Sequence, residues 1–413
     1  MKNKKIWLYF ALLLPFIEPQ LFKTSGFEIA DKIFLVFKLV SSVIIAFEYM
    51  REVKYHFSKY VILMTMIQIA TFIGTILNKG SISRFLGPAM ISIVIIMLGE
   101  LVYRSNWKLF FDIVEKYLSI FFVFNLISIL LCKLNVGCFV ADGPTFLGID
   151  NRWIYFLLPW TFISFYNSYI KHKRICFRAW VIYACSTLSL LTVWSVGALC
   201  SFLAVPICYC FFKSFLRHKR INKIIARLIF ILSVIFNYYL VTEILLEKLS
   251  NIISLYLKKD ITLSGRVYLW RTVLGVLKDS PFFGKGVQSS SDDMMFFYKS
   301  AGYLQCAAVN HPHNHYMNVA YHGGYVALLL FVLILFLVAR EIDHISNSKL
   351  KYWFLSFALS VILAGTVDTL DFSLFYIMIP IIASVPKIED KNLLYTWKKL
   401  HSAKPIRKFK FVL

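Results

Sequence analysis

The sequence SGRVYLWR (264–271), followed by SPFFGKG (280–286), HPHNH (311–315) and YHGG (321–324), leads into a long apolar run. The apolar run is long enough to cross a bilayer as a helix, whereas the residues before it are polar and interrupted by glycine. Arginine, histidine and asparagine side chains beside a membrane-crossing segment predict chemistry at its end.

The rest of the chain is strongly apolar. Of its 413 residues, 59% are hydrophobic and 17% are aromatic, and the mean hydropathy is +0.68. A soluble domain of this length does not need so much apolar surface, so the composition predicts an integral membrane protein. Strands of a β-barrel would alternate in polarity, which favours helices here. The predicted fold class is all-α, a polytopic bundle of membrane helices.

About twelve membrane-spanning helices are predicted from apolar windows of about 17–25 residues. The windows lie near residues 6–22, 32–50, 60–77, 85–103, 109–132, 153–170, 178–195, 197–213, 224–246, 317–340, 351–369 and 371–386. The seventh and eighth windows meet with almost no loop between them.

Lysine and arginine set the predicted orientation. Two thirds of the 45 basic residues fall in loops that would share one side of the membrane, so we predict that both termini are cytoplasmic. The net charge of +23 is then mainly a topology signal, with some attraction to anionic headgroups, and does not indicate a nucleic-acid partner. The predicted organisation is an N-terminal bundle of about nine helices (1–246), one large extracytoplasmic loop (247–316), C-terminal transmembrane helices (317–386) and a basic cytoplasmic tail (387–413).

The large loop is predicted to contain two short helices. The apolar spacing in 247–259 suits a helix lying flat in the membrane interface. A second helix is predicted over 265–279, with Ser264 as its N-cap and Pro281 as its stop, and this helix places Arg266 in its first turn.

His313 is the candidate base. Pro312 suits the first position of the next helix, which would put His313 in the first turn, at the positive end of the helix dipole. Such a place favours anions and lowers the pKa of a histidine, so that neutral His313 can accept a proton from a hydroxyl. Arg266 would add a permanent charge that can clamp phosphate oxygens, which suggests group transfer from a lipid-borne phosphate. The plain alternatives are a headgroup anchor for the arginine and solvated or hydrogen-bonded histidines.

The spacing of His311, His313 and His315 allows a metal site as an alternative. Alternate residues share a face only on a strand, and the proline between the first two opposes a strand. On a helix, His315, Asn318 and His322 would line up instead, either lining a cavity or forming hydrogen bonds within the bundle. We therefore predict no metal and no other cofactor.

The eight cysteines give no metal or redox motif. Most lie in or beside apolar runs, and none forms a CxxC pair. Cys138 and Cys306 fall in predicted loops, and whether they pair stays open because sequence does not show proximity.

The order of these motifs resembles the O-antigen polymerase and ligase superfamily. The resemblance rests on SGR, Trp, Pro and GxG within 264–286, then HN (313–314) and GG (323–324) before an apolar helix. The segment FLGIDNR (146–152), followed by Pro159, resembles exopolysaccharide polymerases of the same group. The number of helices and the single large outer loop match over nearly the whole chain.

The resemblance implies an inverting, metal-independent glycosyltransferase that acts on undecaprenyl-pyrophosphate-linked glycans at the outer face of the bacterial plasma membrane. By position, Arg266 matches the motif arginine taken to bind pyrophosphate, and His313 matches the histidine proposed as the base. Many members have an arginine where this chain has Val196, so a second cation must come from elsewhere. The hypothetical cation substitutes and further pyrophosphate-binding residues are Arg271, Arg152, Arg84, Asn314 and His315.

The leading hypothesis is a polymerase of capsule or another surface exopolysaccharide. Its expected partners are undecaprenyl-pyrophosphate-linked oligosaccharide, membrane lipids, and the chain-length regulator and flippase of the same pathway. A ligase that passes the glycan to another acceptor uses the same chemistry, although the similarity around 146–159 favours the polymerase. A flippase or transporter would carry charge within its helices around a central cavity, whereas Lys38, Glu48 and Glu100 are the main embedded charges here.

Overall fold

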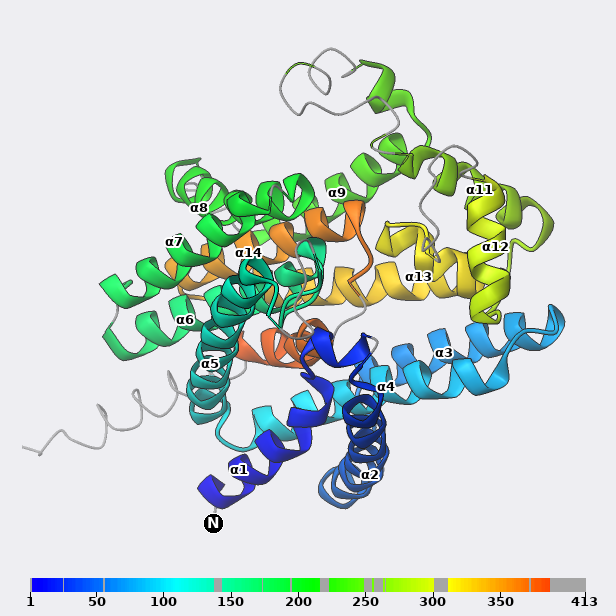
Figure 1. The fold of residues 1–413 in the computed structure, drawn as a ribbon. Coiled ribbons are helices and arrows are strands. Elements are labelled where there is room, and N and C mark those ends of the chain that lie inside the picture. Colours follow the sequence, from blue (N-terminus) through cyan, green and yellow to red (C-terminus); the bar gives the residue numbers. More distant parts are fainter. Residues whose placement is uncertain are drawn as a thin grey trace, which may run out of the picture.

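The all-α class is confirmed in the computed structural model, whose described residues form helices and no strand (Figure 1). These residues are 2–24, 26–54, 56–136, 143–172, 174–193, 195–215, 223–248, 255, 263, 265–300, 311–370 and 373–386. Cys138 and Cys306, whose pairing the sequence leaves open, lie outside them, as do nearly all of the predicted interfacial helix 247–259 and the basic tail 387–413.

Helices follow one another with short connections along the chain. In order they are α1 (Lys2–Leu13), the 3-10 turns η1 (Leu14–Phe16) and η2 (Gln20–Lys23), α2 (Glu28–Val53), α3 (Lys59–Leu77), α4 (Ile82–Arg104), α5 (Trp107–Leu134), the 3-10 turn η3 (Asp150–Trp153), α6 (Ile154–His172), α7 (Phe177–Thr192), α8 (Val196–Phe215), α9 (Ile225–Val241), α11 (Arg266–Asp279), α12 (Ser290–Ser300), α13 (His315–Asp343), α14 (Ser348–Val367) and a last helix, Ser373–Pro386.

The chain is a multi-pass membrane protein. Among the described residues, eight helical segments are long and apolar enough to cross a membrane. Three shorter apolar helices are α7, α9 and Ser373–Pro386. Each of the twelve predicted windows overlaps helical residues, while the number of actual crossings stays a prediction.

Side-chain caps explain where several helices begin. In each case the residue before the helix accepts a hydrogen bond from a backbone N–H of the first turn, which would otherwise lack a partner. The capping residues are Ser58 for α3, Ser81 for α4, Asn106 for α5, Asn314 for α13 and Asn347 for α14. Helix α11 matches the predicted helix 265–279 to within one residue. Its N-cap is Gly265, with φ 82°, so the prediction of Ser264 as the cap was wrong.

Helix α13 is the centre of the bundle. It packs against α3, α9, α11 and α14, and α14 in turn packs against α8 (Figure 1). Aromatic rings fill the space around α14, where Phe162 stacks on Phe357 with ring centroids 4.1 Å apart. Helix α2 lies at the edge, and apolar side chains such as Phe37, Val43 and Phe47 are exposed, as expected of a helix that faces lipid.

Helix α13 is broken at Gly324, where φ is 65° and ψ is −165°. The segment 281–286 lies against the break and pairs with the backbone groups that the break frees. Four backbone hydrogen bonds join the two segments: Tyr325 N to Pro281 O (2.7 Å), Val326 N to Phe282 O (3.3 Å), Lys285 N to Tyr321 O (2.7 Å) and Gly286 N to His322 O (3.1 Å). The sequence motifs SPFFGKG and YHGG are therefore the two halves of one structural joint.

Replacing Gly324 by alanine should destabilise the protein by about 2–4 kcal/mol. The backbone at Gly324 is in a region that only glycine adopts readily, and an added Cβ would lie 2.3 Å from the Phe282 carbonyl. The melting temperature of the purified protein in detergent measures the effect. Gly87→Ala on α4 is the matched control, because nothing lies within 4 Å of its added Cβ. Equal melting temperatures for the two variants would contradict the description of the joint.

Candidate functional site

His313 lies in the loop just before α13. The helix begins at His315, because the side chain of Asn314 accepts a hydrogen bond from Met317 N (3.1 Å) and so acts as the cap. The prediction that Pro312 is the first helical residue was therefore wrong, and His313 lies before the helix and not in its first turn. Its φ of 47° is left-handed, which turns the chain sharply in front of the cap.

Three buried contacts hold this loop in place. Trp270 of α11 donates its indole N–H to Pro312 O at 2.9 Å. The fully buried Asn314 donates to Asn237 Oδ1 (2.8 Å) on α9 and to Thr366 O (3.0 Å) on α14. Asn314, predicted to bind pyrophosphate, thus has its side chain engaged inside the fold, where it positions its neighbour His313.

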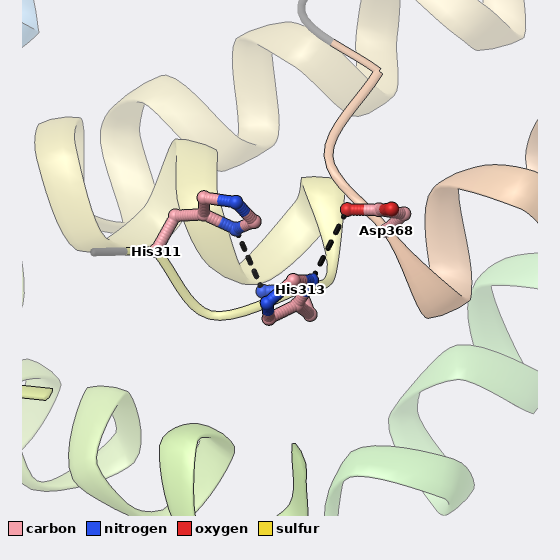
Figure 2. Close-up of side chains that lie close together, drawn as sticks. All are labelled: His311, His313 and Asp368. Atoms are coloured by element: carbon pink, nitrogen blue, oxygen red, sulfur yellow. Dashed lines mark hydrogen bonds and ion pairs between the residues drawn. The ribbon is translucent and has the colours of Figure 1, made fainter. Parts of the chain in front are cut away.

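His313 meets a carboxylate that the sequence analysis did not single out. Its Nδ1 lies 3.3 Å from Oδ1 of Asp368, the residue that ends α14 (Figure 2). On its other side, His313 donates its backbone N–H to Nδ1 of His311 at 3.3 Å, and the two imidazole rings lie 4.2 Å apart. Asp368 is thereby placed to hold the ring of His313 in one orientation and one tautomer.

Two arginines lie close to this group. The pKa of His311 is lowered to about 4, mainly by burial; interactions with His313, Arg152 and Arg266 act in the same direction, and the carboxylate of Asp368 opposes them. Burial also lowers the pKa of Arg266, with Asp368 acting in the opposite sense. Burial alone would raise the pKa of Asp368, but the hydrogen bond with His313 and the surrounding positive charges outweigh it and hold the pKa below its usual value. The site therefore combines a carboxylate, two imidazoles and two guanidinium groups.

The stability of the protein should fall as the pH drops from 6.5 towards 4. In this window the unfolded chain protonates His311 while the folded protein, in which the pKa is about 4, does not, so acid favours unfolding. At ~1.4 kcal/mol per pH unit the full loss is about 3 kcal/mol. Melting temperatures measured from pH 7 to 4.5 should fall less steeply in His311→Gln than in wild type. The exposed His56→Gln is the control, and equal slopes for wild type and His311→Gln would contradict a buried, neutral His311.

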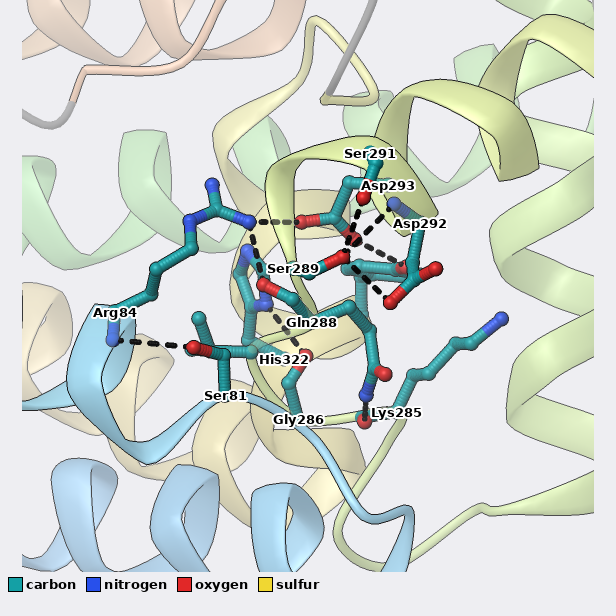
Figure 3. A network of polar contacts seen from close by, with 12 residues as sticks. Ser81, Arg84, Lys285, Gly286, Gln288, Ser289, Ser291, Asp292, Asp293 and His322 are labelled. Atoms are coloured by element: carbon teal, nitrogen blue, oxygen red, sulfur yellow. Dashed lines mark hydrogen bonds and ion pairs between the residues drawn. The ribbon is translucent and has the colours of Figure 1, made fainter.

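Of the predicted substitute cations, Arg84 and Arg271 are held by carboxylates. Arg84 pairs with Asp293 (3.2 Å), which also accepts a hydrogen bond from the Tyr321 hydroxyl at 2.9 Å (Figure 3). Arg271 donates both its Nε and a terminal nitrogen to Glu243. These ion pairs already balance much of the two positive charges.

Arg152 has a different environment. Its guanidinium donates to the neutral Gln20 Oε1 at 3.1 Å, and its charge acts on His311. Val196 lies between Ser195 and Gly197, and both of these neighbours line a small pocket with Arg266 and Asp368. Arg152 is therefore the predicted substitute best placed to add a second cation.

A cavity of about 360 Å³ opens beside the site, between α3, α4 and α13. As predicted for one helix face, His315, Asn318 and His322 all line it, together with His311. His315 Nδ1 also accepts a hydrogen bond from Leu370 N at 3.3 Å. The α3 and α4 walls mix apolar residues (Met64, Ile67, Phe85, Pro88 and Ala89) with polar ones (Gln68, Thr71, Arg84 and Ser92). A cavity lined by both polar and apolar side chains suits an amphiphilic ligand.

His311, His313 and Asp368 also form a group that can hold a metal ion. Their ligand atoms lie within 4.8 Å of one another, whereas His315, the third histidine weighed in the sequence, is not among them. Two imidazoles and a carboxylate are a ligand set that zinc or iron accepts. The charges of Arg152 and Arg266 oppose a divalent cation here and favour an anion, so the absence of a metal stays our prediction.

Residues 182–332 match the family model of the O-antigen ligase. The match covers a little over a third of the chain and includes Arg266 and His313, whereas Arg152 and Asp368 lie outside it. Neither the curated proteins nor the solved structures contain a match to this chain.

Proposed function

We propose that this chain, which belongs to the O-antigen polymerase and ligase superfamily, is a polymerase of bacterial surface polysaccharide. It would move a growing glycan from undecaprenyl pyrophosphate to the next lipid-linked repeat unit. The observation that carries the proposal is the pairing of His313 with Asp368 beside Arg266 and Arg152, in a multi-pass membrane bundle.

The proposed reaction exchanges one bond for another at the anomeric carbon of the donor sugar. The acceptor hydroxyl oxygen attacks this carbon from the face opposite the pyrophosphate, which inverts its configuration. The new glycosidic C–O bond forms as the bond to the phosphate oxygen breaks, and the electron pair leaves with the pyrophosphate. The hydroxyl proton passes to His313, which acts as general base.

The remaining residues would neutralise the leaving group and orient the base. Arg266 and Arg152 would neutralise the negative charge that grows on the departing pyrophosphate. Burial of Arg266 strengthens this interaction, because less water screens its charge. Asp368, whose low pKa keeps it ionised, would hold the His313 ring in orientation and stabilise it after it has taken up the proton.

The proposed location is the bacterial plasma membrane, with the site at its extracytoplasmic face and both termini in the cytoplasm. The proposal rests on the placement of the basic residues along the sequence. A site on that face receives lipid-linked repeat units after a flippase has moved them across. A chain-length regulator of the same pathway is the further proposed partner.

Reconstitution tests the function. Purified protein in proteoliposomes would receive undecaprenyl-pyrophosphate-linked repeat units from its host, and the length of lipid-linked glycan would be followed by gel electrophoresis. Wild type should produce longer glycan, and adding a chelator should leave the rate unchanged. Transfer only to a different added acceptor would instead assign a ligase, and transbilayer movement of the lipid without transfer would assign a transporter. Loss of activity in chelator would assign a metal to His311, His313 and Asp368.

A further inference from the structure

A second cavity, of about 140 Å³, lies between the turn that follows α1, α2, α4 and the last helix. It shares Pro88, Ser92 and Tyr376 with the large cavity beside His311, so the two spaces adjoin. A ligand that extends from one to the other would reach His311, the neighbour of the proposed base, at one end and the second cavity at the other.

The second cavity carries its own excess of positive charge. Glu18 accepts ion pairs from Lys23 (2.7 Å) and from Lys38 (2.6 Å), and its side chain is only 3% exposed. Gln20, which also lines the cavity, holds the guanidinium of Arg152. Two ammonium groups therefore share one carboxylate, and a third cation lies close by.

Lys38 is an unusual residue for its position. It lies within α2, a helix that is long and apolar enough to span the membrane, and its side chain is 14% exposed. Charged side chains inside membrane segments are costly and usually mark a ligand path. A purely structural link between α2 and the turn that holds Glu18 would need only one lysine, and buried ion pairs add little to stability. The uncompensated charge favours an anion in the cavity.

We propose that this second cavity binds an anionic group of the glycan acceptor, either its pyrophosphate or the carboxylate of an acidic sugar. The proposal rests on the proposed polymerase function. Polymerisation joins two lipid-linked molecules, each with its own pyrophosphate, and the donor's pyrophosphate takes the place beside Arg266. The acceptor's reacting hydroxyl lies at the opposite end of the repeat unit from its pyrophosphate. An anion site connected through a cavity to His311, which contacts His313, is the arrangement that such an acceptor requires.

The test separates donor from acceptor. The donor analogue is blocked at the hydroxyl that would accept the next glycan, so it can only donate. In the acceptor analogue a carbon atom replaces the oxygen between the sugar and the pyrophosphate, so the sugar cannot be transferred and the molecule can only accept. With the full-length protein in proteoliposomes, Lys38→Met should raise KM for the acceptor about tenfold, as expected for loss of one charged hydrogen bond. KM for the donor and kcat should change little, and Lys38→Arg should restore most of the affinity.

Two further variants decide between a binding and a structural role. Glu18→Gln breaks the same ion pairs but leaves both lysines, so it should not raise KM for the acceptor. Lys32→Met removes an exposed lysine from the same helix and should have no effect. Equal damage from Lys38→Met and Glu18→Gln would overturn the proposal in favour of a structural link. If Lys38→Met does not fold, Lys23→Met takes its place, because Lys23 is the half-exposed ion-pair partner of Glu18. This variant should also raise KM for the acceptor.

The source of the anion is identified with modified acceptors. If a neutral linker in place of the pyrophosphate abolishes the effect of Lys38→Met, the cavity binds pyrophosphate. If only reduction of the sugar carboxylates abolishes it, the cavity binds an acidic sugar. An effect that persists in an acceptor without either group overturns the proposal. No elongation by wild type would refute the polymerase itself, whereas elongation with an unchanged acceptor KM in Lys38→Met would refute this inference alone.

Discussion

Replacing His313 by alanine should lower the rate of glycan elongation by about 10²–10⁴-fold, the usual contribution of a general base. The folded protein should persist, because the contacts that hold the loop come from Trp270 and Asn314. The measurement is kcat in proteoliposomes. His344→Ala, an exposed histidine beyond the other end of α13, is the matched control and should leave kcat unchanged.

The pairing with Asp368 makes the prediction more specific. Asp368→Asn should lower kcat by about 10²-fold or more, because an amide cannot hold the imidazole in the same tautomer or stabilise its protonated form. The double variant His313→Ala/Asp368→Asn should be no slower than His313→Ala alone, since two residues that act as a unit are not additive. If the loss in kcat of the double variant equalled the product of the two single losses, Asp368 would act independently of His313. Near-normal elongation by His313→Ala would mean that another residue is the general base.

The helices were largely predictable because the signals for each one lie in its own residues and in those next to it. A membrane helix needs about twenty apolar residues in succession, and a cap or a glycine beside it marks its end. The start of α13 shows the limit of this reasoning. Pro312 and Asn314 are both good starting signals, and the asparagine prevails because its side chain bonds to the N–H of Met317. The consequence for the site is large, since His313 falls outside the helix instead of inside its first turn.

Asp368 escaped the sequence analysis for a different reason. It lies 55 residues from His313, and the predicted helix 351–369 included it, whereas the observed helix α14 ends one residue before it, at Val367. Nothing in its neighbourhood indicates a partner, because only the packing of α14 against α13 brings the two side chains together. An acidic residue near the outer end of an apolar window was the one available signal.

The glycine motifs also show that sequence order does not reveal long-range contacts. SPFFGKG and YHGG, at 280–286 and 321–324, were set beside the site by their order in the chain. Their structural role is to meet at the break in α13, which sequence spacing does not reveal, because the pairing is long-range. The motifs that resemble the family thus divide into residues at the candidate site, such as Arg266, and residues that build the joint next to it.

Arg266→Lys should lower kcat by about 10²–10³-fold although the side chain keeps a basic group. Lysine is a point charge and cannot clamp two phosphate oxygens as a planar guanidinium does. The burial that lowers the pKa of Arg266 adds a second reason. Arginine begins so high that it stays charged, whereas a lysine in the same place starts about two units lower and gives up its proton more readily. The loss should therefore deepen as the assay pH is raised, which simple misplacement of a charge would not produce.

The matched control is Arg271→Lys, one and a half turns further along α11. Arg271 is more exposed and pairs with Glu243, so the same substitution should leave elongation close to wild type. Arg152→Lys provides the comparison within the site, because Arg152 is the second cation that acts on His311. If Arg266→Lys keeps normal kcat at every pH while Arg152→Lys loses it, the pyrophosphate lies against Arg152, and the arginine matched by position is structural. If both lose activity while Arg271→Lys does not, the two guanidinium groups act together on the leaving pyrophosphate, and the arginine missing at Val196 has been replaced from the turn before α6.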